Sequence, residues 1–264
     1  MSITSAVSTI NDSNPALVLV HGLGSAGTIW KSLLPELVKD FTVYSINLPG
    51  HGDATLDKQE KYDPRSLGKM ILQYMKEVQK VHQMHVVGNS LGGWIALEMA
   101  AVEPNRISSV TALAPAGLWV EPPTMKIPPS IDSRILAKFS QFFMPIAFHI
   151  PPLKALGYRK ITHLRRELSY ESCRDSVTAM ARSKGYKPLW QGIRGRRFDS
   201  PINPEVKVSI VFGDDDLTLP ENLAQDRSVG PSHAKWIRVA NCAHVIMWNH
   251  SETTVKLIRE SAGL

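Results

Sequence analysis

The sequence has 264 residues, with 30 Lys and Arg against 24 Asp and Glu, and a formal net charge of +6. Apolar residues make up 43% of it, enough to bury a large core without disulfide or metal staples. This mix excludes low-complexity disorder, collagen and a coiled coil. The longest apolar stretches fall far short of the roughly 20 residues that a membrane span needs.

The cysteines and the first residues bear on the compartment. Only Cys173 and Cys242 occur, too few for a disulfide framework or for a zinc site by themselves. The first twenty residues carry no Lys or Arg and no long apolar core, so we expect no signal peptide. A reduced, cytoplasmic location is the default expectation.

The positive charge belongs to one segment. Residues 121–200 hold 15 basic and 6 acidic residues, a balance of +9, whereas the rest of the chain holds 15 and 18, a balance of −3. A solvated helix face is one interpretation of this asymmetry, and attraction of an anionic substrate or an acidic surface is another. No phosphate-binding or nucleic-acid motif accompanies the charge, which favours the solvated face.

Short runs rich in Val and Ile predict buried strands. They are Ala16–Val20, Phe41–Leu48, Met84–Val87, Ile107–Leu113, Val206–Phe212 and Lys235–Ala240. Residues 1–14 are polar and predict either a frayed end or one edge strand. Helical patterns lie between most of the runs, at Thr28–Val38, Ser66–Lys80, Leu91–Val102 and Thr253–Ser261. This alternation indicates an α/β fold with a mostly parallel central sheet flanked by helices.

The alternation fails between residues 118 and 201. That stretch is rich in proline and has no convincing strand, and its helical patterns cover roughly Asp132–Phe143, Tyr158–Glu167 and Arg174–Ser183. We therefore expect one core made of residues 1–117 and 202–264, with residues 118–201 inserted as a helical cap.

The strongest local motif is Gly88-Asn89-Ser90-Leu91-Gly92, which follows a predicted strand and precedes a predicted helix. This is the setting of a nucleophile elbow, a strained turn that exposes a serine hydroxyl and needs small residues two positions before and after it. An idle serine in a Gly-rich turn is the alternative, and the correct flanks disfavour it.

A serine hydroxyl needs a base, and the base needs an acid to orient it. Asp214, Asp215 and Asp216 follow the strand Val206–Phe212, and His244 follows the last strand. Among the nine histidines, only His244 has that place. Ser90, an aspartate and His244 therefore predict a catalytic triad in that chain order.

Together these motifs resemble the α/β-hydrolase superfamily, and within it the small, capped, single-domain serine hydrolases. The resemblance covers nearly the whole chain and includes His21-Gly22-Leu23-Gly24 and Leu48-Pro49-Gly50-His51-Gly52. It implies Asp216 as the triad acid, because members often have Gly-x-x-Asp followed by a short apolar stretch and Pro. Asn47 departs from the Asp that relatives commonly carry before this turn.

An oxyanion hole needs two backbone N–H donors. One is expected from Leu91, the residue after the nucleophile, and the resemblance implies Leu23 as the other, with His21 holding the loop shape. The stretch Gly22–Gly27 also fits the dinucleotide fingerprint Gly-x-Gly-x-x-Gly. That fingerprint wants an acid at the end of the second strand, where Asn47 stands, so the oxyanion loop is favoured.

Apolar groups near the triad and in the predicted cap are candidates for a substrate pocket. They are Trp94, Trp119, Phe142, Phe143 and Met247. Packing on the sheet is the other interpretation of these side chains.

The main hypothesis is a serine hydrolase of the carboxylesterase type, which forms an acyl-enzyme on a small-molecule ester. It needs no cofactor and no metal, and we expect no nucleic-acid partner and no stable membrane insertion. A carbon–carbon bond hydrolase of ring-cleavage products or a cofactor-free perhydrolase on the same triad is an alternative. Val245 after the histidine and Ser25-Ala26 in the oxyanion loop argue against the carbon–carbon hydrolase. A slow-turnover ligand-binding receptor is another alternative.

Overall fold

The computed structural model describes residues 2–126, 135–139, 150–163 and 168–264. Its centre is a seven-stranded sheet with the order β1-β3-β2-β4-β5-β6-β7. The strands are β1 (Thr4–Ser8), β2 (Ala16–Val20), β3 (Thr42–Asn47), β4 (Met84–Asn89), β5 (Ile107–Leu113), β6 (Lys207–Gly213) and β7 (Lys235–Val239). Only β1 is antiparallel, pairing with β3 from Thr4 opposite Asn47. The predicted mostly parallel sheet is confirmed, and the polar N-terminus supplies an edge strand.

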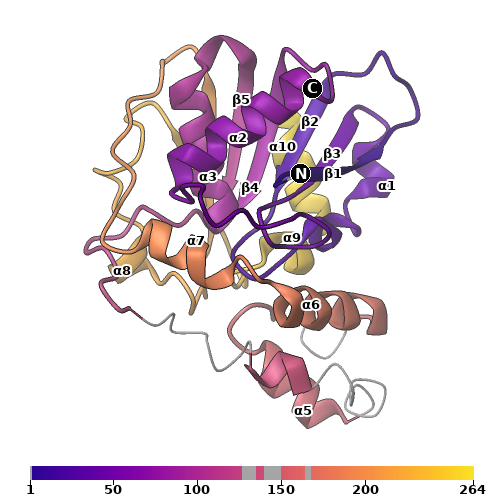
Figure 1. The fold of residues 1–264 in the computed structure, drawn as a ribbon, viewed down its shortest axis with the longest axis vertical. Coiled ribbons are helices and arrows are strands. Elements are labelled where there is room, and N and C mark those ends of the chain that lie inside the picture. The colour runs from indigo at the N-terminus through magenta and orange to yellow at the C-terminus, as the bar shows by residue number, and fades with distance from the viewer. Residues whose placement is uncertain (1, 127–134, 140–149, 164–167) are drawn as a thin grey trace.

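Helices cover both faces of this sheet. The helical elements of the core are η1 (Gly27–Trp30), α1 (Leu34–Leu37), α2 (Pro64–Glu77), α3 (Leu91–Val102), η2 (Pro104–Arg106), α8 (Glu221–Ala224), α9 (Ile246–Asn249) and α10 (Ser251–Ala262). Helices α2 and α3 lie on one face and α10 on the other (Figure 1). The fold is therefore a three-layer α/β sandwich, as the alternating pattern predicts.

Helix α3 is buried along most of its length because α2 packs over its outer side. Gly68 of α2 makes this contact close: a Cβ on it would lie 3.3 Å from the Met99 side chain. The Asp63 side chain caps α2 by accepting a hydrogen bond from the Ser66 backbone N–H (3.1 Å). The sheet and α3, the two elements that meet at Ser90, thus lie inside one large core.

The predicted helix Thr28–Val38 is wrong as a single element. The structure divides it into η1 and α1, separated by a turn. Pro35 is the physical reason, since a proline inside one long helix would remove a hydrogen bond and clash with the preceding turn. It instead occupies the first turn of α1, where its missing N–H costs nothing.

Residues between β5 and β6 form helices α5 (Pro151–Tyr158), α6 (Tyr170–Arg182) and α7 (Tyr186–Ile193). They lie at the end of the molecule where the parallel strands terminate (Figure 1). The predicted helix Tyr158–Glu167 is wrong over its described part, because Pro151 and Pro152 begin a helix instead and α5 ends at Tyr158. The predicted helix Asp132–Phe143 is described only at residues 135–139, which are helical.

Close backbone contacts attach this segment to the core. The Gly185 N–H donates to the Gly50 carbonyl (3.2 Å), and a Cβ on Gly185 would lie 2.0 Å from the Pro49 carbonyl oxygen. A Cβ on Gly24 would likewise lie 2.8 Å from the Met180 side chain. Helices α6 and α7 are therefore packed directly over the loops that follow β2 and β3. Within the described ranges, no helix is long and apolar enough to cross a bilayer.

Candidate active site

Ser90 stands alone between the end of β4 and the start of α3, in a strained conformation with φ 58° and ψ −119°. A non-glycine residue there costs about 1–3 kcal/mol, a strain that clusters at functional sites. The surrounding glycines are required by space. A Cβ on Gly88 would lie 2.0 Å from the Gly92 carbonyl oxygen, and one on Gly92 would lie 2.1 Å from that of Val20. The turn has the geometry that the Gly-x-Ser-x-Gly spacing predicts.

Two loops from other strands reach this turn. In the loop after β2, a Cβ on Gly22 would lie 3.0 Å from the Ser90 Cβ and 3.6 Å from its Oγ. On the other side, the Asn89 amide donates to the carbonyls of Leu113 (3.1 Å) and His244 (3.3 Å). Asn89 thereby ties the backbone of the His244 loop to the residue that precedes Ser90.

His244 is paired with Asp216. Its Nδ1 lies 2.7 Å from Asp216 Oδ2, and the two residues are 6% and 3% exposed. The other carboxylate oxygen, Oδ1, accepts the backbone N–H groups of Thr218 and Leu219, each at 2.8 Å. Burial by itself would raise the pKa of the Asp216 carboxyl, but His244 and these two donors outweigh it and lower the pKa below its usual value. Asp216 is therefore an ionised carboxylate held rigidly against the imidazole.

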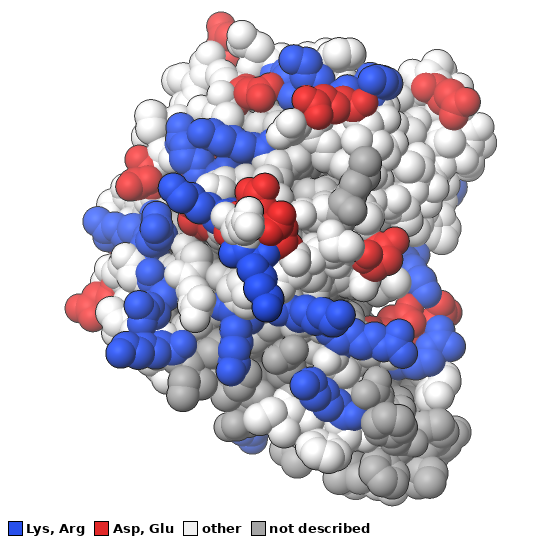
Figure 2. Space-filling view, viewed as in Figure 1, with Lys and Arg blue, Asp and Glu red and all other residues white. Residues whose placement is uncertain are grey.

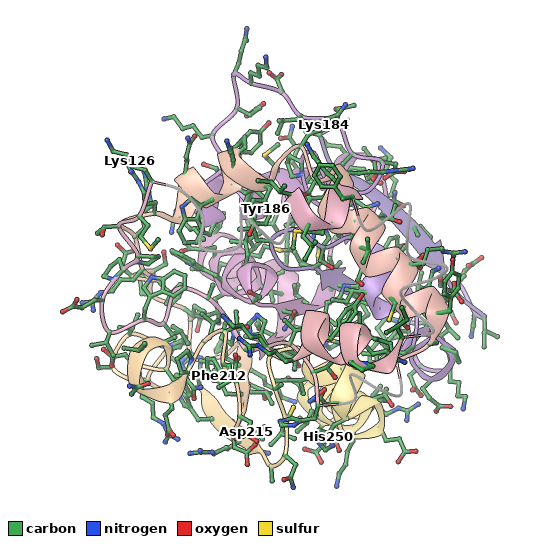
Figure 3. The ribbon with its side chains drawn as sticks, turned by 90° about the horizontal axis from the view of Figure 1, so that it is seen from below. Lys126, Lys184, Tyr186, Phe212, Asp215 and His250 are labelled. Carbon is green, nitrogen blue, oxygen red and sulfur yellow. The ribbon has the colours of Figure 1, made fainter. Side chains whose placement is uncertain are left out.

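The two neighbouring carboxylates face elsewhere. Asp214 Oδ1 accepts the backbone N–H of Cys242 (3.1 Å), which fixes the approach to the His244 loop. Asp215 lies at the surface, with its Oδ2 3.2 Å from Nε2 of His163 (Figure 3). Of the three consecutive aspartates, Asp216 is the one that contacts His244, and it is the one that the family resemblance implies.

The loop after β2 is clamped by two buried histidines. His21 Nδ1–H donates to the Gly22 carbonyl (2.7 Å), and its Nε2 accepts the Leu48 N–H (3.1 Å). His51 Nε2 accepts the Gly24 N–H (3.2 Å), and its Nδ1 lies 3.0 Å from the Pro49 carbonyl oxygen. Both hydrogen-bond sets require neutral rings. Burial, reinforced by His51, lowers the pKa of His21 to about 3.

The loop after β2 and the first turn of α3 contain the two predicted oxyanion donors, Leu23 and Leu91. Among the described residues, neither the Leu23 nor the Leu91 N–H donates to a protein acceptor. Leu91 is the first residue of α3, whose N-terminus carries partial positive charge. The family resemblance implies that His21 alone holds the shape of the loop after β2. His51 was missed because its bond to Gly24 joins residues 27 positions apart, and no local pattern shows it.

The predicted pocket residues are mostly deep in the core. Trp94 and Trp119 are buried with ring centroids 5.7 Å apart and an interplanar angle of 84°. Their indole N–H groups are satisfied internally, by Glu98 Oε1 (3.1 Å) and the Arg196 carbonyl (2.7 Å). Met247 is fully buried in α9. Phe142 and Phe143 lie outside the described residues. A substrate role for these five side chains stays a prediction.

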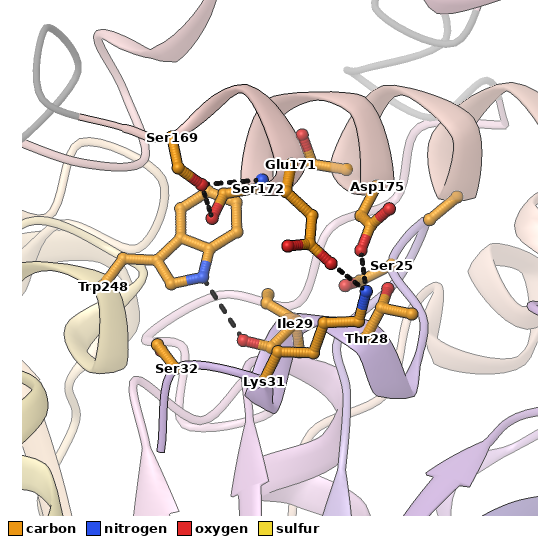
Figure 4. Close-up of a pocket in the computed structure, with 12 residues that line it drawn as sticks. Ser25, Thr28, Ile29, Lys31, Ser32, Ser169, Glu171, Ser172, Asp175 and Trp248 are labelled. Carbon is orange, nitrogen blue, oxygen red and sulfur yellow. Dashed lines mark hydrogen bonds and ion pairs between the residues drawn. The ribbon is translucent and has the colours of Figure 1, made fainter. Parts of the chain in front are cut away.

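A hollow that no sequence pattern indicated lies between η1 and α6 (Figure 4). Its volume is about 250 Å³, and Trp248, one turn after His244, forms part of its wall. Lys31, the residue after η1, spans it, with Nζ 2.6 Å from both Glu171 Oε1 and Asp175 Oδ2 of α6. These ion pairs fasten α6 to the core beside Ser25, just beyond the Leu23 loop.

A metal site needs several ligating side chains close together. In the parts of the chain that the structure describes, no three His, Cys, Asp or Glu side chains gather in such a group.

Comparison with known proteins identifies the family. The model of the alpha/beta hydrolase fold family matches residues 15–251. The chain belongs to this family. The hydrolase is 28% identical over 258 residues to a pimeloyl-[acyl-carrier protein] methyl ester esterase of Methylococcus capsulatus, covering 93% of this chain and 94% of that protein. It is 31% identical over 127 residues to the enzyme of that name from Aeromonas hydrophila, covering 48% of this chain and 47% of that protein.

A solved structure agrees in fold. A hydrolase from Pseudomonas aeruginosa superposes with a TM-score of 0.73 at 16% identity, covering 99% of this chain and 94% of that one. At such low identity the likeness shows the fold alone. The predictions of the α/β-hydrolase fold, of the superfamily and of a hydrolase enzyme are thereby confirmed.

Proposed function

We propose that this hydrolase cleaves a carboxylic ester through an acyl-enzyme, with Ser90 as nucleophile, His244 as base and Asp216 as the acid that orients it. The observation that carries the proposal is the buried Asp216–His244 pair, 2.7 Å between Oδ2 and Nδ1. That bond fixes the proton on Nδ1 and leaves Nε2 free to accept the serine proton.

The reaction begins with attack of Ser90 Oγ on the ester carbonyl carbon while His244 takes the hydroxyl proton. The carbonyl oxygen becomes an oxyanion that accepts the N–H groups of Leu23 and Leu91. His244 then gives its proton to the leaving alcohol, and the acyl group stays on Ser90. A water molecule, deprotonated by His244, releases the acid by the same steps in reverse order.

Residues 118–201 form the cap over this site in the proposed enzyme, with Trp94, Trp119, Phe142, Phe143 and Met247 as candidate apolar walls of the acyl pocket. The Methylococcus relative is named for a methyl ester of an acyl chain carried on a protein. A methyl ester of a medium-length acyl chain is therefore the first substrate to try, as the free ester and attached to a carrier.

The test is a chain-length series of p-nitrophenyl and methyl esters with wild type and Ser90→Ala. We expect turnover by the wild type and a loss of at least about 10³-fold in the variant. Wild-type rates in Ser90→Ala would overturn the assignment. An organophosphonate that labels wild type and leaves Ser90→Ala unlabelled gives an independent check. Binding without turnover would favour the receptor hypothesis.

A further inference from the structure

The basic charge of the inserted segment is concentrated on one element of the structure, α7 with its two flanks. Residues 182–197 contain six basic residues and no acidic one, and all six side chains are exposed. They are Arg182, Lys184, Lys187, Arg194, Arg196 and Arg197. Figure 2 shows Lys and Arg side chains running as a band across the face on which α7 lies.

Within the described residues, these six cations have no ion-pair partner. No acidic oxygen of the described residues lies within 4.0 Å of any of the six, although Lys31 and Arg174 nearby are paired. Arg196 and Arg197 contribute to lowered pKa values of Asp63 and Asp226, yet neither forms a contact pair. A solvated helix face normally intersperses the two charge signs. Here one sign accumulates, which marks a surface that attracts anions.

Large apolar side chains project from the chain beside these cations. The segment that follows Trp119 runs along the end of α7, since the Pro123 carbonyl accepts the Gly195 N–H (2.8 Å) and the Met125 carbonyl accepts the Trp190 indole N–H (3.0 Å). Met125 is 56% exposed. Val120 and Leu223, joined by a backbone bond of 3.0 Å, are 49% and 60% exposed.

We propose that this basic-apolar surface, namely the six cations with Val120, Met125 and Leu223, docks the hydrolase on an anionic lipid surface. A bilayer interface supplies anionic headgroups over a wide area, and beneath them an apolar layer that accepts single projecting side chains. Separate apolar side chains among spread cations fit that partner. A surface that binds a protein partner would instead have a compact apolar patch with few charged residues at its centre.

Nucleic acid fits the surface less well. Proteins that bind single strands stack bases on exposed aromatic rings. The two aromatic side chains of α7, Tyr186 and Trp190, are buried in the molecule. Figure 3 shows the contrast, with Tyr186 inside and Lys126 and Lys184 projecting outward on the same side. The inference does not depend on the proposed ester hydrolysis, because docking is measured without substrate.

The experiment is co-sedimentation of the full chain with vesicles of phosphatidylcholine alone and of phosphatidylcholine mixed with phosphatidylglycerol in equal parts. We expect binding to the anionic vesicles only, and its loss in about 1 M NaCl, where the Debye length is about 3 Å. Each cation near such a surface contributes about fivefold to partitioning. The variant Lys184→Gln/Lys187→Gln/Arg194→Gln should therefore bind about a hundredfold more weakly.

A matched control removes three exposed cations from α2 and the turn after it, as Lys69→Gln/Lys76→Gln/Lys80→Gln. This control variant should bind anionic vesicles within a few fold of the wild type. A loss of binding as large as that of the α7 variant would mean that only net charge matters, and would overturn the proposal. The variant Met125→Ser/Leu223→Ser keeps the charge and should weaken vesicle binding severalfold. No change there would overturn the lipid assignment, as would tighter binding to polyglutamate or to a short DNA than to anionic vesicles.

Discussion

The substitution Asp216→Asn tests the charge partner of His244 at almost constant shape. Both backbone N–H groups of Thr218 and Leu219 donate to Oδ1, so the amide oxygen of the new Asn takes that place. Its amide nitrogen then faces His244 Nδ1, where Asp216 Oδ2 now lies at 2.7 Å. An N–H donor at that point forces the imidazole proton onto Nε2, which can no longer accept the serine proton.

Loss of the Asp216 negative charge lowers the rate further, in addition to the effect of the wrong imidazole tautomer. At an effective dielectric constant of about 20 and about 4 Å between charge centres, a carboxylate stabilises an imidazolium by about 4 kcal/mol. This corresponds to about a thousandfold in rate. With the tautomer included, kcat should fall by between about 10³ and 10⁴.

The assay is the initial rate on p-nitrophenyl butyrate, with thermal unfolding followed by circular dichroism to confirm the fold. Asp214→Asn and Asp215→Asn are matched controls, because each makes the same carboxylate-to-amide change at a position one or two residues from Asp216. Asp214 interacts with the backbone of Asn241 and Cys242, and Asp215 forms an exposed pair with His163. Neither carboxylate contacts the His244 ring, so both variants should keep rates within about tenfold. Equal losses in all three variants, or a folded Asp216→Asn with wild-type kcat, would refute the reasoning.

Three further predictions concern stability and reactivity. His21 is neutral when folded, with its pKa lowered from 6.5 to about 3, so the unfolded chain binds the extra proton as pH falls below about 6.5. The free energy of unfolding therefore falls progressively with pH, by about 2 kcal/mol at pH 5. Measured by urea unfolding, the decrease in this free energy between pH 7 and pH 5 should be smaller for His21→Gln than for the wild type. Gly92→Ala places a Cβ 2.1 Å from the Val20 carbonyl oxygen and should destabilise by at least about 2 kcal/mol, a Tm decrease of about 4–8 °C by calorimetry. Burial, together with Asp214 and Asp216, raises the pKa of the Cys242 thiol to about 12, so iodoacetamide at pH 8 should leave it unmodified in the native enzyme, and rapid labelling would contradict this.

The sequence by itself determined the features that depend on neighbours along the chain. Strand and helix patterns placed β2, β5 and α3 at their observed bounds, because elements buried on all sides require continuous apolar runs that end at turn residues, and such runs are visible locally. The Gly-x-Ser-x-Gly spacing predicted the strained turn at Ser90. Gly88 is needed by a close contact with the Gly92 carbonyl inside that turn, and Gly92 by a close contact with the Val20 carbonyl of β2.

Tertiary structure decided what depends on distant segments. The family resemblance implied Asp216 among three consecutive aspartates, and packing of the β6 loop against the β7 loop turns its carboxylate toward His244. The His51 clamp on Gly24 and the surface that Met125 shares with α7 arise in the same way. Such contacts join residues that pattern reasoning treats separately, because hydrogen bonds and charge act over distance in space and not along the chain.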